Sequence, residues 1–111
     1  MSNTLLKGGI VYDAAQNIKK QRLDVAVQDT KITELAVDID PLNFDEVIDV
    51  TSKIVSPGLI DLHCHVYHGF NSTGVHPDVA GVGSGVTTVV DGGSAGHSNF
   101  GGFPTYVVPD S

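Results

Sequence analysis

The sequence predicts an α/β protein that begins with a small β-rich segment. Short runs that alternate apolar and polar residues occupy the first half of the chain, where helical periodicity is nearly absent. Nearly continuous apolar runs at residues 59–67 and 86–90 are typical of buried parallel strands. Between them, residues 77–84 have the signals of a short helix, with Pro77 in the first turn and Gly85 past the end.

The β-rich segment is predicted to extend over residues 1–57. Its expected elements, in chain order, are a strand at 4–12 that is interrupted by Gly8-Gly9, a polar loop at 13–21, a hairpin of residues 23–28 and 32–37, and short strands at 46–50 and 53–56. Pro57-Gly58 is a strong turn signal. We therefore expect a second structural unit to occupy residues 58–111.

The second unit is predicted to contain two βα units. The strand at 59–67 precedes the short helix, and the strand at 86–90 precedes a helix at 98–108. Gly101, Gly102 and Pro104 weaken that last helix, because glycine and proline are poor residues for a helix interior. The strand at 59–67 has apolar residues on one face and polar residues on the other. Because we expect it to lie in a parallel sheet, we predict that it is buried on both sides.

Composition excludes several classes of protein. With 41% hydrophobic and 17% charged residues, 111 residues suffice for one modest core, which argues against disorder. A net charge of −7 makes nucleic acid and anionic membrane unsuitable partners. No apolar run approaches the ~18 residues of a membrane span. The single cysteine, Cys64, excludes an intrachain disulfide and fits a reducing cytoplasm, where we expect the protein to be located.

His63 and His65 are spaced as metal ligands on a strand. Residues i and i+2 lie about 6.5–7 Å apart on one face of a strand, so two imidazoles there can converge on one ion such as Zn²⁺. Asp61 shares that face and is expected either to orient a histidine or to stay below the metal, whereas Cys64 points to the other face and is expected to pack. A bare His-x-His pair is more often two ordinary histidines, but its position on a buried strand that opens a βα unit favours a metal site.

The run VSPGLIDLHCH at residues 55–65 resembles the signature of the amidohydrolase superfamily. The preceding β segment is similar to that of the same superfamily, from LLKGGIVYD to VIDVTSKIVSPGLID. The later stretch GVTTVVDGGSAGHSNFGGF resembles the subgroup labelled dihydroorotase-like or amidohydrolase/deacetylase. The resemblance covers nearly all 111 residues.

This resemblance implies a (β/α)₈ TIM-barrel metallohydrolase with a small β-sandwich-like domain, of which this chain holds the β segment and about two βα units. It also implies one or two divalent ions, most often zinc, with His63 and His65 among the ligands. In the family, a metal-bound hydroxide attacks an amide, ester or cyclic amide bond, because the metal lowers the pKa of bound water. The implied substrate is a small polar molecule.

The resemblance also has departures. The family's remaining ligands, a lysine and two histidines, and its proton-shuttle aspartate belong to barrel strands beyond residue 111, so no catalytic residue is assigned in this chain. Dihydroorotases usually carry an arginine two residues after the histidine pair, and Tyr67 stands there in this sequence. Literal dihydroorotase activity is therefore not expected.

Three further residues are candidates for substrate contact: Tyr67, His68 and His97. The alternative for His68 is a solvated loop histidine, and for His97 a residue of the loop after the second strand. His76, before a proline, is expected to start a helix. Asp91 is expected either to face the pocket or to cap a helix N-terminus.

Two hypotheses of function follow. The first is the N-terminal fragment of a metal-dependent hydrolase of C–N amide, cyclic amide or ester bonds, inactive as 111 residues alone and completed by the C-terminal portion of the same protein or by another copy. The second is a non-catalytic binding or assembly module derived from the amidohydrolase N-terminus. Whether more chain follows Ser111 would separate them.

Overall fold

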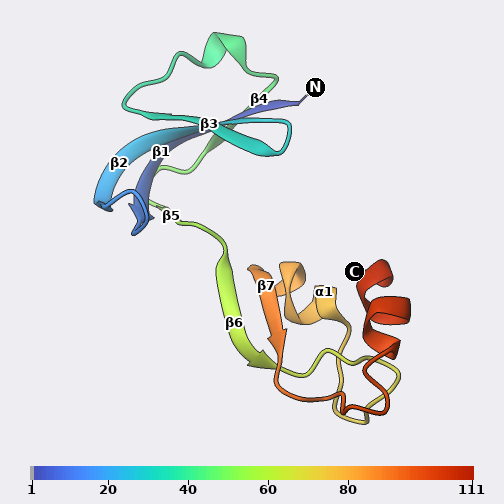
Figure 1. Cartoon of the computed structure of the whole chain (residues 1–111). Coiled ribbons are helices and arrows are strands. Elements are labelled where there is room, and N and C mark those ends of the chain that lie inside the picture. The colour runs from blue at the N-terminus through green and yellow to red at the C-terminus, as the bar shows by residue number, and fades with distance from the viewer. Residues whose placement is uncertain (1) are drawn as a thin grey trace. The chain divides into compact units, whose positions relative to one another are not determined.

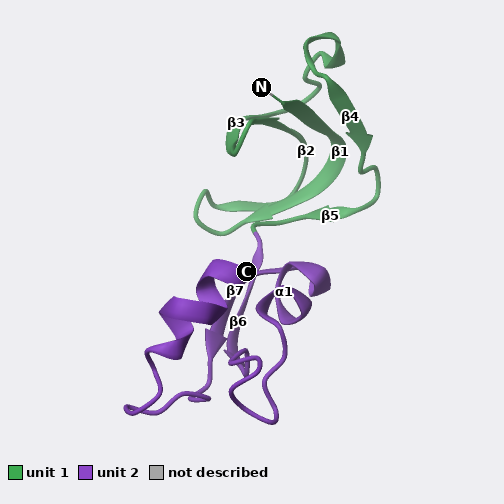
Figure 2. Ribbon diagram, turned by 90° about the vertical axis from the view of Figure 1, so that its right-hand side faces the viewer, with its two compact units in different colours: residues 1–57 green, residues 58–111 purple. Residues whose placement is uncertain are grey.

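Strands make up most of the regular secondary structure, and the helices are short (Figure 1). The computed structural model describes residues 2–111. These divide into two compact units, residues 2–57 and residues 58–111, with the boundary at Pro57-Gly58 (Figure 2). The chain is thus a mixed α/β protein whose two parts have separate cores.

The first unit is a five-stranded sheet with the order β3-β2-β1-β4, in which β5 also pairs with β1. Antiparallel pairing joins β1 to β2 and β2 to β3, whereas β4 and β5 run parallel to successive parts of β1. Its strands are β1 (Asn3–Asp13), β2 (Ile18–Gln28), β3 (Lys31–Ala36), β4 (Glu46–Asp49) and β5 (Ile54–Val55). The expected hairpin and the two expected short strands are confirmed.

The glycine pair in β1 produces the expected irregularity. The β1–β2 register shifts between Leu6 and Gly9, and Gly8 has a φ of 80°, in the left-handed region that glycine adopts without strain. A Cβ atom on Gly9 would lie 2.6 Å from Cγ2 of Val55, so glycine also permits the close approach of β5. The bulge therefore allows one long strand to pair on both sides.

The polar loop expected at residues 13–21 is shorter than predicted. Strand β2 already begins at Ile18, which pairs with Asp13, and Gln21 pairs with Val11. The polar composition of this part of β2 is compatible with a strand because Lys19, Lys20 and Gln21 are exposed. The partner β1, rather than local hydrophobic alternation, makes these residues a strand.

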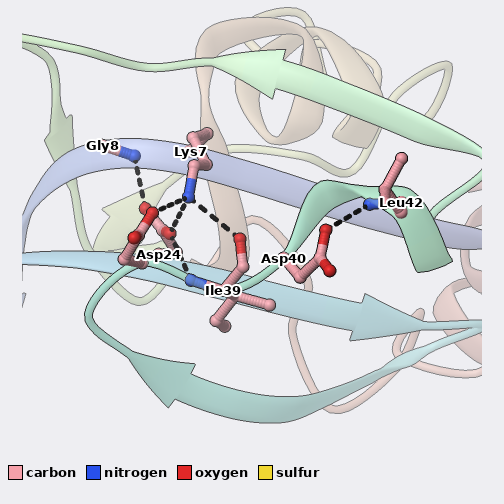
Figure 3. Close-up of polar contacts among 7 residues, drawn as sticks. Lys7, Gly8, Asp24, Ile39, Asp40 and Leu42 are labelled. Atoms are coloured by element: carbon pink, nitrogen blue, oxygen red, sulfur yellow. Dashed lines mark hydrogen bonds and ion pairs between the residues drawn. The ribbon is translucent and has the colours of Figure 1, made fainter.

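A buried carboxylate connects three segments of the first unit (Figure 3). Asp24 on β2 is only 4% exposed. Its oxygens accept hydrogen bonds from Lys7 Nζ (2.8 Å), from the Gly8 N–H in the bulge (2.7 Å) and from the Ile39 N–H after β3 (2.9 Å). Lys7 Nζ also donates to Asp38 Oδ1 and to the Ile39 carbonyl, both at 2.9 Å.

These hydrogen bonds decide the ionisation of Asp24. Burial raises the pKa of its carboxyl group, but the hydrogen bonds from Lys7, Gly8 and Ile39 together lower the pKa below the ordinary value of 3.8. The network sits beside a small apolar core of Leu5, Val11, Val25 and Ala26, which are all buried. A short 3₁₀ turn, Pro41–Asn43, follows it and is capped by Asp40, whose side chain accepts from the Leu42 N–H (Figure 3).

The second unit has the expected order of strand, helix and strand, but a π-helical turn and a 3₁₀ turn over residues 103–110 take the place of the helix expected at 98–108. Its elements are β6 (Leu59–Cys64), α1 (Pro77–Ala80), a 3₁₀ turn (Val82–Ser84), β7 (Val86–Asp91), a π-helical turn (Phe103–Val107) and a final 3₁₀ turn (Val108–Asp110). Strands β6 and β7 pair in parallel. The helix α1 ends at Gly81, whose φ and ψ of −90° and −111° are not helical.

The prediction that the first strand of this unit is buried on both faces is wrong. Leu59, Ile60 and Leu62 are 62%, 60% and 75% exposed, because residues 58–111 provide a two-stranded sheet and only short helical turns to cover it. The strand also ends at Cys64 instead of residue 67. Among residues 2–111, no helix has the length and apolar character needed to span a membrane.

The core of the second unit instead forms after β6. Val66, Tyr67 and Val107 are buried, and the Tyr67 ring stacks on Phe70 and Phe103 with centroid separations of 4.8 and 4.4 Å. Aromatic stacking of this kind contributes roughly 0.5–1.5 kcal/mol per pair beyond the area that it buries. These contacts hold the irregular C-terminal helical segment against the segment that follows β6.

We predict that Asp24→Asn destabilises the first unit by about 2–3 kcal/mol. The wild-type carboxylate accepts hydrogen bonds from two backbone N–H groups and from the Lys7 ammonium, and the NH₂ group of asparagine would face one of these donors instead of accepting from it. The matched control is Asp38→Asn, which removes a charge from the same lysine at an exposed position and should cost less than about 1 kcal/mol. Urea unfolding, with amide hydrogen exchange of β1 and β2 to localise the effect, measures both. Equal losses in the two variants would contradict a structural role for the buried carboxylate.

The stability of the first unit should also fall in acid. Because the pKa of folded Asp24 lies below the ordinary value of 3.8, its contribution is fully present above that pH and is lost as pH falls through the lower, folded pKa. Urea unfolding between pH of about 5 and about 2 should therefore show the wild type and Asp24→Asn converging in free energy of unfolding. A constant difference between them over this range would show that the folded pKa is not lowered.

Candidate metal centre

The carboxyl end of β6 brings two imidazole rings together. His63 is the penultimate residue of β6, and His65 directly follows the strand's final residue, Cys64. Their ring centroids are 5.6 Å apart, with an angle of 81° between the ring planes. This separation is shorter than the about 6.5–7 Å between Cα atoms at positions i and i+2, so the two rings converge.

The pair has the dimensions of two ligands to one ion. A zinc ion lies about 2.0–2.1 Å from a ligating nitrogen, and the ring centroid lies about 1 Å behind that nitrogen, so two rings that share an ion have centroids up to about 6 Å apart. The observed separation of 5.6 Å is within that limit. Both residues are exposed.

The end of the neighbouring strand holds this region in place. Asp91, the last residue of β7, accepts hydrogen bonds from the Val66 N–H (2.9 Å) across the sheet and from the Gly93 (3.0 Å) and Ser94 N–H groups of its own loop. Burial raises the pKa of Asp91, but these hydrogen bonds and one from the Ser94 side chain lower the pKa below the ordinary value of 3.8. The carboxylate thus connects the two strand ends.

Neither role expected for Asp91 is therefore observed. The residue does not cap a helix, because a loop rather than a helix follows β7 within the described residues. It also does not point freely into a pocket, since both carboxylate oxygens accept backbone N–H groups. Of the two roles expected for Asp61, orientation of an imidazole is not observed, because its carboxylate accepts from the backbone N–H of His63 (3.0 Å).

Two residues after β7 contact the histidines. The hydroxyl of Ser94 lies 2.7 Å from Nδ1 of His65. The His63 ring lies against Gly92 so closely that a Cβ atom there would collide with Nε2. The sequence alone assigned no role in the site to Gly92 or Ser94. The available signal was its place after a parallel strand, since the carboxyl ends of neighbouring parallel strands meet at one edge.

Cys64 does not add a third ligand. Its thiol lies on the other side of β6, with Sγ 3.5 Å from the Val90 carbonyl oxygen. Burial, together with the nearby charges of Asp61 and Asp91, raises the pKa of the thiol above its ordinary value, so it remains protonated at neutral pH. Within residues 2–111, no group of three or more His, Cys, Asp or Glu side chains is arranged to hold a metal ion.

Of the three residues proposed to contact substrate, Tyr67 has a different role in this structure. Its side chain is 1% exposed, and its hydroxyl donates a hydrogen bond to the Asn99 carbonyl oxygen. The predicted strand extended to Tyr67, but β6 ends at Cys64. Tyr67 therefore packs in the core of the second unit.

The other histidines remain exposed or serve the local structure. His68 and His97 are both exposed, on the loops that follow β6 and β7. His76 starts α1 as expected, because its Nδ1 accepts from the Asp78 N–H at 3.2 Å. Its Nε2 lies 3.2 Å from Asp110, and its ring lies edge-on to that of His68 with centroids 5.7 Å apart.

Comparison with known proteins defines the class of the chain. No family model matches it. A deacetylase of Agrobacterium fabrum is 45% identical over 64 residues, which are 58% of this chain and 16% of the relative. A dihydroorotase of Lactobacillus helveticus is 45% identical over 62 residues, 56% of this chain and 13% of the relative. A crystal structure of a dihydroorotase matches 100% of this chain and 29% of that chain, with 32% identity and a TM-score of 0.84.

These similarities place the chain in the amidohydrolase superfamily. Within the superfamily, the relatives that it resembles are named deacetylase and dihydroorotase. The chain spans about 16% of the length of the deacetylase relative, so the activity of a whole protein does not follow from the match alone.

We predict that Gly92→Ala displaces the His63 ring, because the added methyl group would occupy the space of that imidazole. The matched control is Gly96→Ala in the same loop, where the nearest atom to an added Cβ is Asn99 Oδ1 at 3.9 Å. The measurement is the chemical shift of the His63 ring protons by NMR. Unchanged His63 signals in Gly92→Ala, or equal changes in Gly96→Ala, would contradict the observed packing.

Proposed function

We propose that this chain forms the first part of the metal centre of a metal-dependent amidohydrolase. In that role His63 and His65 hold a divalent ion, most suitably zinc, at the carboxyl end of the first barrel strand. The observation that carries this proposal is the convergence of the two rings, with centroids 5.6 Å apart, beside the end of a parallel neighbouring strand. Active sites of (β/α)₈ barrels open at that end of the strands.

The proposed architecture is the start of a TIM barrel that follows a small β domain. Its support is the parallel pair β6 and β7 with a helix between them, which is the repeating unit of such barrels. The similarity of the whole chain to part of a dihydroorotase crystal structure also supports it. The exposed apolar side of β6 is the surface that further strands and helices would cover.

The proposed reaction is hydrolysis of an amide, cyclic amide or ester bond in a small polar substrate. A bound zinc ion supplies a hydroxide nucleophile at neutral pH by lowering the pKa of water. In this proposal His63 and His65 would hold the ion, and His68 and His97, which lie on the loops after β6 and β7, would contact the substrate. Tyr67 stands where dihydroorotases usually carry an arginine, so this position supplies no cation for a substrate carboxylate, which supports a deacetylase-like rather than a dihydroorotase substrate.

A second candidate function is a non-catalytic binding or assembly module. The observation that favours it is the exposure of Ile60 and Leu62 on one face of β6, apolar side chains of the kind that another chain covers. On this alternative the chain would associate with a partner, either a second copy or a separate C-terminal portion, without holding a metal. Zinc binding separates the two candidates.

We predict that the chain binds zinc weakly through its histidine pair, because catalytic zinc sites use three protein ligands and this chain supplies two. Isothermal titration of the metal-free chain with Zn²⁺ should show that His63→Ala and His65→Ala each lower the affinity by about tenfold or more. The matched control is His97→Ala, a histidine that is exposed and should leave the affinity unchanged. Equal effects of all three variants would contradict a specific site.

The hydrolase itself is tested in a chimera. The chain replaces the corresponding segment of the Agrobacterium fabrum deacetylase, and hydrolysis of N-acyl and cyclic amide substrates is measured with Zn²⁺. We expect turnover that His63→Ala abolishes, whereas the 111-residue chain alone shows none above its own His63→Ala control. A folded, zinc-loaded chimera without turnover would favour the binding module.

A further inference from the structure

We propose that Tyr67 is a positioning residue of the substrate site: its hydroxyl fixes the loop after β7 at Asn99 and thereby holds the turn that carries His97. The inference rests on the proposed function, in which His97 contacts the substrate. Tyr67 touches neither the ion nor the substrate and acts through the loop. The contacts that support this role run from the Tyr67 ring to its hydroxyl, and from there through Asn99 to the turn.

Two aromatic neighbours hold the Tyr67 ring in one orientation. The ring lies between Phe70 and Phe103, with centroids 4.8 and 4.4 Å away and ring planes inclined by only 18° and 13°. Tyr106 continues the stack beyond Phe70, at 5.7 Å, and Phe100 lies 6.2 Å beyond Phe103. Tyr67 is 1% exposed, so neighbouring atoms enclose its ring. Because the hydroxyl oxygen lies in the plane of the ring, the stack also fixes where the hydroxyl is.

The hydroxyl donates to a main-chain atom of the loop after β7. Its acceptor is the Asn99 carbonyl oxygen, and donation is the only possible direction because a carbonyl oxygen has no hydrogen to give. The same oxygen accepts the Gly102 N–H at 3.1 Å with its second lone pair. A Cβ atom on Gly102 would collide with the Tyr67 hydroxyl, so this approach requires glycine there. The buried hydroxyl thus has the loop as its hydrogen-bond partner.

Asn99 also closes the turn that contains His97. Its Oδ1 atom accepts the Gly96 N–H at 2.7 Å, and its own N–H donates to the Gly96 carbonyl oxygen at 3.2 Å. Residues 96–99 are therefore joined at both ends, with His97 between them. All four residues are exposed, so the turn gains little order from packing. Since the turn is closed on itself and attached through Asn99, the Tyr67 hydroxyl sets the position of His97.

The start of the same loop is attached independently of Tyr67. The Gly92 N–H donates to the Cys64 carbonyl oxygen at 2.7 Å, where β7 ends. Loss of the Tyr67 hydroxyl should therefore loosen residues 96–99 and leave the start of the loop, with its contacts to the histidine pair, in place. This difference gives an internal control within a single variant.

Amide hydrogen exchange of the metal-free chain tests this attachment. Tyr67→Phe keeps the stacked ring and removes only the hydroxyl. We expect exchange of the Gly96 N–H to accelerate by about fivefold, the effect of one net hydrogen bond, while the Gly92 N–H exchanges as in the wild type. Unchanged exchange at Gly96, or equal acceleration at both glycines, overturns the proposal.

A second pair of variants reaches the same contact from the loop. Gly102→Ala places a methyl group in the space of the Tyr67 hydroxyl and should accelerate exchange at Gly96 as Tyr67→Phe does. Gly101→Ala is the matched control, because nothing lies within 4 Å of a Cβ atom added there, and it should leave the exchange unchanged. Equal effects of the two alanine variants would show that the hydroxyl does not hold the turn.

Kinetics of the deacetylase chimera test whether Tyr67 acts through His97. Tyr67→Phe and His97→Ala should each raise KM for N-acyl substrates by about fivefold with a smaller change in kcat. The double variant should match His97→Ala alone, because residues that act through one contact have non-additive effects. Zinc affinity of Tyr67→Phe should stay within a few-fold of the wild type, since the histidine pair is untouched.

An unchanged KM in Tyr67→Phe, or additive effects of the two substitutions, overturns the role of Tyr67 in the substrate site. A chimera without turnover in any variant overturns the proposed function instead. Exchange at Gly96 is measured without metal or substrate, so it still decides whether the Tyr67 hydroxyl holds the turn that carries His97.

Discussion

The parallel pairing of β6 with β7 is the interaction on which the candidate site depends. Parallel strands end at the same edge of a sheet, and here Cys64 at the end of β6 is in register with Asp91 at the end of β7. That register places the loop after β7 beside the two histidines, which precede it by about thirty residues in the sequence. Gly92 then lies under one ring and Ser94 lies beside the other. Without the pairing, the histidines would be two adjacent exposed side chains with nothing to orient them.

Both units of the chain use a partly or fully buried aspartate to hold irregular backbone. Asp24 accepts from the N–H of the β1 bulge and from that of the segment after β3, and Asp91 accepts from the N–H groups of the loops after β6 and β7. In each case the N–H groups lie outside a regular ladder and need an acceptor. The hydrogen bonds outweigh burial and lower the pKa of each carboxyl group, so both remain ionised at neutral pH. The first network supports the fold alone, whereas the second also reaches a candidate ligand.

The second unit combines an ordered pair of histidines with an apolar strand face that its own residues leave exposed. Two imidazoles are fewer than the three protein ligands of a typical catalytic zinc site. The chain corresponds to 29% of the dihydroorotase structure that it resembles, a share compatible with part of a larger active site. The incomplete ligand set and the exposed Leu62 therefore have the same physical origin in our proposal, namely that the strands which would complete the sheet are not among these residues.

Local patterns in the sequence determined the elements, the hairpin of β2 and β3, the unusual backbone at Gly8, and the two histidines at a spacing that brings their rings together. These features depend on the alternation of side chains along a strand or on the conformational freedom of one residue. Both can be predicted from a short stretch of sequence. Only the tertiary structure decided that Ile18 to Gln21 form a strand, that Tyr67 packs in the core, and that Ser94 contacts His65. The physical reason is that each of these depends on a partner that pairing or packing supplies: β1 for residues 18–21, Phe103 for Tyr67, and the register of β6 with β7 for Ser94.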